Sequence, residues 1–151
     1  MENKLRAEAT QVRKDIRETF GVKLESSSST LGELDDIVEE MWKTGWDPRE
    51  GDLNLFTRVF GLLLFEATLD LLEGRPIFRS PNGEVYVHNS IYWPGVEAFP
   101  FHKAFKCLTE HEGETMAYFA RGVGGQLEEK GLLKPEMKER LPKARHSLKR
   151  I

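Results

Sequence analysis

The chain has 151 residues, 39% of them hydrophobic, a net charge of −3 and a single cysteine, Cys107. This length suits one domain with a substantial core, and the weakly acidic balance argues against a dedicated nucleic-acid-binding protein. A lone cysteine excludes an internal disulfide, and the charged segment after Met1 is unlike a secretory signal. We therefore expect a protein of the reducing cytoplasm.

The first part of the chain predicts two helices. Apolar residues recur at helical spacing, which predicts an amphipathic helix over residues 3–20 that ends at Gly21. After a short serine run, Thr30 and Glu33 match a capping box, so a second helix should begin at Thr30. Gly45 should end that helix, and Trp46 should fold back onto its last turn.

The most apolar stretch, about residues 53–73, predicts a long central helix with Asp52 as N-cap and Gly74 in the left-handed position at its end. Charged residues interrupt the stretch, so it is not expected to span a membrane. Its polar residues form two stripes that are rotated relative to each other, which predicts different packing partners for its two halves. Leu55 should be buried, and Gly61 should mark a close helix crossing.

A small antiparallel sheet is expected next, within about residues 76–97, because the pattern changes to period two around the turn Pro81-Asn82-Gly83. Its two or three strands should cover residues 76–80, 84–89 and 91–93. Pro94-Gly95 should stop the third strand. The expected fold class is thus α+β, with helices packed around a long central helix and a small sheet.

Two helices and a basic tail complete the prediction. Pro100 should lie in the first turn of a helix whose buried stripe includes Phe105, with Cys107 as a buried structural thiol. A last main helix, containing Met116 and Leu127, should end at Gly131. We expect a single domain over residues 1–133 and a basic C-terminal tail over residues 134–151.

Sites for chemistry are sparse in this sequence. The four histidines, His88, His102, His111 and His146, lack the spacing of metal ligands, so neither a metal nor a cofactor is expected. Glu66 is a carboxylate within an apolar helix and has Asp70 one turn further on, which leaves a hydrolytic acid/base pair as an alternative. The other interpretation places both residues at the surface or near Arg75.

Charge is distributed unevenly. Eight acids against two bases lie between Leu31 and Asp52, and seven bases against two acids follow from Lys134. Within the second helix, like charges stand one turn apart, which destabilises an isolated helix, so a docking surface for a basic partner is one reading and a solvated face the other. The residues of the proposed binding surface are Asp35, Asp36, Glu39 and Glu40, with four aromatics that border turns: Trp42, Trp46, Tyr92 and Trp93.

The second half of the chain resembles an uncharacterised family of small bacterial α+β domains of unknown function, over about residues 53–130. The resemblance rests on FGLLLFEATLDLLEG, a hairpin, and EAFPFHKAFKCLTEHEGETMAYF. Phe65 stands where that family has a glycine before the acid. The family implies the fold and carries no activity or site residues.

The function expected from these observations is a non-catalytic, cytoplasmic protein-binding module without a membrane segment, in which a partner of basic character binds the acidic helix. A bacterial immunity or antitoxin-type protein is its most concrete form. A hydrolytic enzyme that uses Glu66 and Asp70 is the alternative. A further alternative is nucleic-acid contact through the basic tail.

Overall fold

The computed structural model describes residues 1–24, 27–79, 86–110 and 115–142. Six helices and a three-stranded antiparallel sheet lie within these ranges, as the α+β prediction requires. The helices are α1 (Glu2–Phe20), α2 (Ser27–Lys43), α3 (Leu53–Leu72), α4 (Pro100–Glu110), α5 (Met116–Glu129) and α6 (Pro135–Arg140). The strands are β1 (Arg75–Ile77), β2 (Ser90–Trp93) and β3 (Val96–Ala98), with a 3₁₀ turn η1 (Tyr86–His88) before β2.

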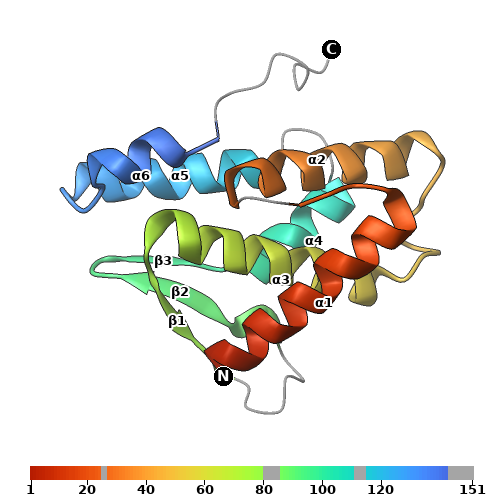
Figure 1. The fold of residues 1–151 in the computed structure, drawn as a ribbon, viewed down its shortest axis with the longest axis horizontal. Helices are drawn as coiled ribbons and strands as arrows, with labels where there is room; N and C mark the ends of the chain where they lie inside the picture. The colour runs from red at the N-terminus through yellow and green to blue at the C-terminus, as the bar shows by residue number, and fades with distance from the viewer. Residues whose placement is uncertain (25–26, 80–85, 111–114, 143–151) are drawn as a thin grey trace.

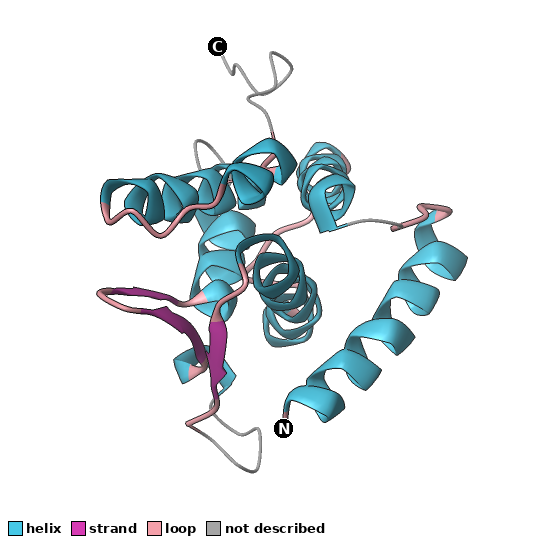
Figure 2. Cartoon of the chain, turned by 60° about the vertical axis from the view of Figure 1, so that its left-hand side comes forward, coloured by secondary structure: helices cyan, strands magenta, loops and turns pink. Residues whose placement is uncertain are grey.

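Helix α3 is the centre of the molecule, with α1 on one side and the sheet on the other (Figure 1, Figure 2). Its closest neighbour is α4, followed by α2 and α1. Every residue from Gly61 to Leu69 is buried, which confirms a buried central helix. The first turns are more open. Leu55 is 54% exposed, so its predicted burial is wrong.

Close packing explains two glycines of this region. A Cβ on Gly61 would lie 2.3 Å from the Phe101 ring and 3.0 Å from the Phe101 Cα, so this residue marks the predicted crossing, made by α4. Gly74 does not end α3 as predicted. Glu73 takes the left-handed conformation instead, with φ of 51°, and Gly74 gives Ile91 room, since a Cβ there would lie 2.3 Å from Ile91 Cγ2.

The sheet has the order β1-β2-β3, and both strand pairs are antiparallel. Pro94-Gly95 is the two-residue turn between β2 and β3, because Trp93 pairs with Val96 and Gly95 has φ of 79°. The predicted stop was therefore a turn, and the strand after it was missed. The described part of the predicted strand over 84–89 contains η1 instead, and the turn at residues 81–83 lies outside the described residues.

The helices before α3 largely follow the sequence pattern. Helix α1 ends at Gly21, which has φ of 69°, as predicted. Helix α2 begins at Ser27 and not at Thr30, so the predicted start is wrong by one turn. The backbone N–H of Trp46 donates to the Met41 carbonyl over 3.0 Å, which folds this residue back onto α2 as expected.

The last helices pack on the domain. Pro100 begins α4 and Cys107 is buried, as predicted, but Phe105 is 40% exposed, against prediction. Part of the predicted tail is α6, which buries Met137. Glu73 forms ion pairs with Lys134 and Arg140, both at 3.3 Å, and these join α6 to the end of α3. In the described ranges, no helix combines the length and apolar character needed to cross a membrane.

Candidate functional site

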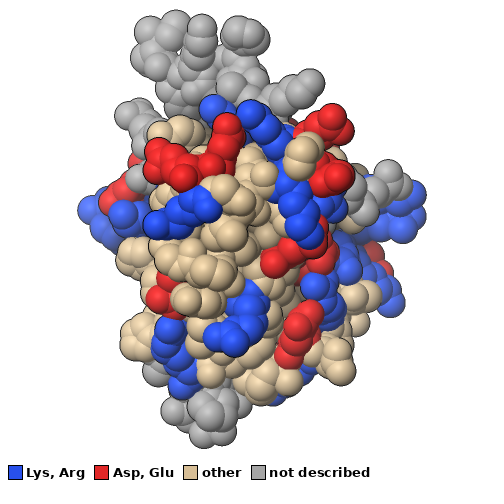
Figure 3. All heavy atoms as spheres, turned by 90° about the vertical axis from the view of Figure 1, so that its left-hand side faces the viewer, with Lys and Arg blue, Asp and Glu red and all other residues tan. Residues whose placement is uncertain are grey.

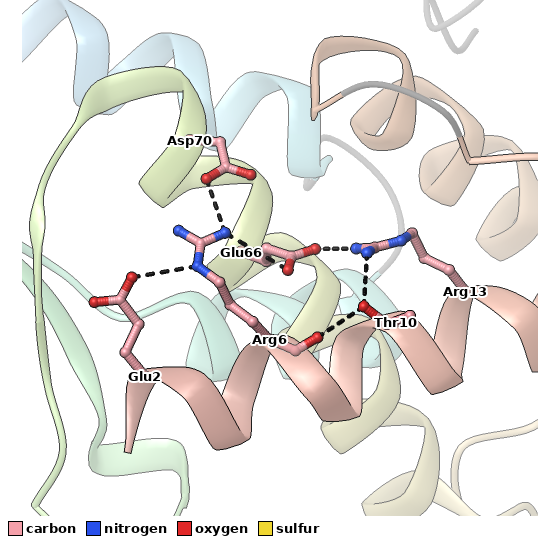
Figure 4. Close-up of polar contacts among 6 residues, drawn as sticks. All are labelled: Glu2, Arg6, Thr10, Arg13, Glu66 and Asp70. Carbon is pink, nitrogen blue, oxygen red and sulfur yellow. Dashed lines mark hydrogen bonds and ion pairs between the residues drawn. The ribbon is translucent and has the colours of Figure 1, made fainter.

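Glu66 lies beneath α1 and is held there by two arginines (Figure 4). Its side chain is only 10% exposed; Arg13 donates to one carboxylate oxygen, and Arg6 lies 3.6 Å from the other. Arg6 also forms an ion pair with Asp70 at 2.9 Å and with Glu2 at 3.2 Å. Glu66 and Asp70, in the second half of α3, therefore lie in the interface between α1 and α3.

Both oxygens of the Glu66 carboxylate are thus engaged by arginine side chains of α1. Partial burial lowers the pKa of the Arg6 guanidinium, but the hydrogen bond and charge of Asp70, with Glu2 and Glu66, outweigh it and raise this pKa above its ordinary value. Arg6 thus forms ion pairs with both carboxylates of the proposed acid/base pair, and Arg13 supplies a second positive charge at Glu66. The geometry supports a role for Glu66 and Asp70 in helix packing.

Asp35 faces the interior of the protein. It is 5% exposed, and its two carboxylate oxygens accept the backbone N–H groups of Met116, at 2.7 Å, and Ala117, at 3.1 Å. These donors belong to the first turn of α5, whose partial positive charge favours a carboxylate there. Asp35 therefore ties α2 to α5, and it does not belong to the exposed acidic face predicted from the sequence.

The outer side of α2 carries a groove. Its volume is about 360 Å³. Acids alternate with apolar side chains along its wall, and the lining residues are Phe20, Val22, Glu33, Asp36, Ile37, Glu40, Met41 and Thr44. Two of the four predicted acids, Asp36 and Glu40, belong to this acidic groove; Glu39 is half-buried and does not line it.

A second groove, of about 250 Å³, lies between α1 and the first turns of α3. Its walls are mostly apolar, and the lining residues are Val12, Asp15, Ile16, Thr19, Phe20, Leu55, Phe56, Val59 and Phe60. Phe20 lines this apolar groove and the acidic groove alike.

The predicted aromatic residues do not gather at these grooves. Trp42 and Trp46 are half-buried and meet edge to face at 6.0 Å, and Trp46 also contacts Phe56, which places them in the packing between α2 and α3. Trp93 is buried and donates its indole N–H to the Leu72 carbonyl at 2.8 Å. Only Tyr92 is exposed, on the sheet, beneath Arg75.

The sheet carries a separate polar cluster. Glu97 accepts hydrogen bonds from the Ser90 hydroxyl, at 2.5 Å, and from Arg79, at 2.6 Å, and these bonds hold the pKa of Glu97 below its ordinary value. Among the described residues, no cluster of histidine, cysteine and carboxylate side chains could hold a metal ion. Figure 3 shows bases and acids interspersed over the side that lies to the left in Figure 1, so this side has no continuous basic surface.

Part of the acidic groove is apparent from the sequence. Glu33, Asp36 and Glu40 recur at spacings of three and four, which places them on one side of a helix, yet Glu33 was assigned only to a capping box. The other wall comes from Phe20 and Val22, which lie outside α2. No local pattern indicates that the end of α1 would lie beside α2.

Comparisons with known proteins give this chain no relatives: no protein-family model, no curated protein and no solved structure matches it. The resemblance over residues 53–130 consequently has no support beyond its own short motifs. Any functional assignment depends on the geometry of the described residues.

Proposed function

We propose that this chain is a non-catalytic protein-binding module that holds a basic and partly apolar segment of a partner protein in the acidic groove beside α2. One observation carries the proposal. Three carboxylates and several apolar side chains line the acidic groove, which has a volume of about 360 Å³, and its lining residues include no lysine or arginine. Such a surface complements a segment that has both positive charge and a large apolar side chain.

The chemistry of the groove also explains why acids stand close together on α2. Like charges one turn apart raise the free energy of the isolated helix. A bound cation would offset this repulsion, and it would accelerate association at low ionic strength. An immunity or antitoxin-type protein of the cytoplasm, which neutralises a basic partner, is the most concrete form of the proposal.

The test measures binding of a fluorescein-labelled helical peptide of 18 residues built only from leucine and lysine, by fluorescence anisotropy. The triple variant Glu33→Lys, Asp36→Lys, Glu40→Lys should weaken binding by about tenfold or more at low salt, because three attractive charges become repulsive. Raising the ionic strength should weaken binding to the wild-type protein, since salt screens exposed charges.

A matched control reverses three exposed acids outside the groove: Glu110, Glu129 and Glu136. This variant has the same net charge as the groove variant and should keep most of the affinity. The proposal fails if the wild-type protein does not bind the peptide, or if both triple variants lose affinity equally.

A further inference from the structure

We infer that the acidic groove and the apolar groove together form one site, which receives a single basic amphipathic helix of the partner with two large apolar side chains, one on each side of Phe20. This inference rests on the proposed function and names the form of the partner. The two grooves share a wall, and a partner that filled only one would leave apolar surface of the other exposed to water.

Phe20 is the feature that joins the grooves. It is the last residue of α1, it is 46% exposed, and it lines both the acidic groove and the apolar groove. A large aromatic side chain that stands between two cavities is the kind of residue that contributes most to binding when a partner removes it from water.

The apolar groove adds a second exposed anchor point. Leu55 projects from the first turn of α3 and is more than half exposed, while Val59 one turn further on is half-buried. The deeper wall is made of core residues, among them Ile16 and Phe60. This groove is therefore rigid at its base and open at its rim, which suits the insertion of one apolar side chain.

Charge identifies the occupant. The residues that line the two grooves include four acids and no lysine or arginine, and the acids are Asp15, Glu33, Asp36 and Glu40. A purely apolar partner would bring no positive charge to this acidic surface, and an acidic partner would be repelled. A basic segment satisfies both the charge and the apolar walls.

A helix is the form of segment that offers these groups together. Side chains three or four residues apart lie on the same side of a helix, so two apolar anchors can point inward while lysine or arginine residues flank them. Helices bind other proteins in this way, with apolar side chains inserted into a hydrophobic groove.

The experiment uses the full chain and three 18-residue peptides of alanine and lysine. One carries two leucines, seven residues apart on one face, and the other two each retain a single leucine. The two-leucine peptide should bind the wild-type protein about tenfold more tightly than either single-leucine peptide, which corresponds to one buried apolar anchor.

Variants of the protein locate the anchors. Phe20→Ala should weaken the two-leucine peptide by about tenfold, because both grooves lose their shared wall. Leu55→Ser should lower the affinity for the two-leucine peptide by about fivefold. The same substitution should change the affinity for the tighter-binding of the two single-leucine peptides by less than twofold. Tyr118→Ala removes an aromatic ring that is 59% exposed on α5, outside both grooves, and should have no effect.

The outcomes separate this inference from the proposed function. If the triple variant of the groove acids loses affinity for the peptide but Phe20→Ala and Leu55→Ser leave the affinity unchanged, only the acidic groove binds the partner and the inference is wrong. If no basic peptide binds the wild-type protein, both the proposed function and this inference are wrong.

Two other occupants of the grooves would also overturn the inference. A dimer that is seen in sedimentation and that Leu55→Ser dissociates would make a second copy of the chain the occupant. A peptide that binds only after deletion of residues 143–151 would make the chain's own tail the occupant.

Discussion

The two halves of α3 differ in how completely they are covered. From Gly61 to Leu69 every residue is buried, and the one carboxylate among them is neutralised by arginines of α1. Before Gly61, Leu55 is exposed, Val59 is half-buried, and the end of α1 stands beside a groove. We call these the closed half and the open half of α3.

The difference shows that apolar content alone does not decide what is buried. Both halves are rich in leucine and phenylalanine, but the ion pairs between α1 and the closed half, in which its arginines contact Glu66 and Asp70, are the less exposed ones. The Glu8–Arg58 pair of the open half lies in a more exposed position. Over the open half, α1 reaches its last residue at Phe20 and the chain turns away. The uncovered apolar surface lies next to the acids of α2, and this coincidence makes it a candidate binding surface.

The largest difference between the two halves of α3 should appear when one apolar side chain in each half is truncated. Phe65→Ala should lower the free energy of unfolding by about 3–5 kcal/mol, because this ring is fully buried between Phe78 and Phe101. Leu55→Ala should change it by less than about 0.5 kcal/mol. Urea denaturation followed by circular dichroism measures both. Equal losses would show that the open half is not open in solution.

A second test compares neighbouring acids on the two sides of α2. Asp35→Ala should destabilise the protein by about 2 kcal/mol, since two buried N–H groups at the start of α5 lose their acceptor. Asp36→Ala, on the exposed side, should cost less than about 0.5 kcal/mol and should weaken peptide binding instead. Thermal melts and anisotropy titrations provide the two readouts. The assignment fails if the two substitutions exchange effects.

A smaller effect is expected from the ion pairs between α1 and α3. A double-mutant cycle of Arg13→Met and Glu66→Gln should give a coupling energy of about 1 kcal/mol, a modest value because the Arg13 side chain is 31% exposed. The matched control is the Glu8–Arg58 pair, which joins the same helices at 3.6 Å in a more exposed position. Its coupling should stay below about 0.5 kcal/mol. A larger coupling energy for the Glu8–Arg58 pair than for the Arg13–Glu66 pair would contradict the placement of Glu66 in the interface between α1 and α3.

The smallest effect concerns pH and the sheet. Because hydrogen bonds from Ser90 and Arg79 lower the pKa of Glu97 in the folded state, this group stabilises the fold above its ordinary pKa. That stabilisation is lost as the pH falls through the ordinary value towards the lower, folded one. Arg79→Gln should raise the pKa of Glu97 and reduce the loss of stability on acidification, and carboxyl NMR titration measures this pKa directly. An unchanged pKa would show that these bonds do not persist in solution.

Much of the fold could be predicted because the deciding signals are local. Gly21 ends α1, Gly61 lies at a helix crossing, and Pro100 starts α4, and each depends on one residue and its immediate neighbours. The strand β3 was missed because Pro-Gly was interpreted as a stop. The same dipeptide also makes a tight turn, and only pairing with Trp93 distinguishes the two.

The site could be predicted only in part, since its walls join segments distant in sequence. The acids of α2 indicated a charged side, but nothing local separates Asp35 from Asp36: the first is turned inward by α5, whose N–H groups come 81 residues later. Likewise, the apolar neighbours of Glu66 in the sequence mark it as an unusual carboxylate, but they predict neither its burial beneath α1 nor its arginine partners. Its arginines lie 53 and 60 residues before it, and no periodicity connects them.

Glu73 has a consequence for how this protein should be screened. A non-glycine residue at φ of 51° costs about 1 kcal/mol, and its carboxylate meanwhile meets two cations of the α6 region. Glu73→Gly would remove the backbone cost and both exposed ion pairs together, so the two contributions would nearly cancel in the melting temperature. Hydrogen exchange at the α6 amides would nevertheless become faster, so a survey of thermostability alone would misclassify this residue as inert.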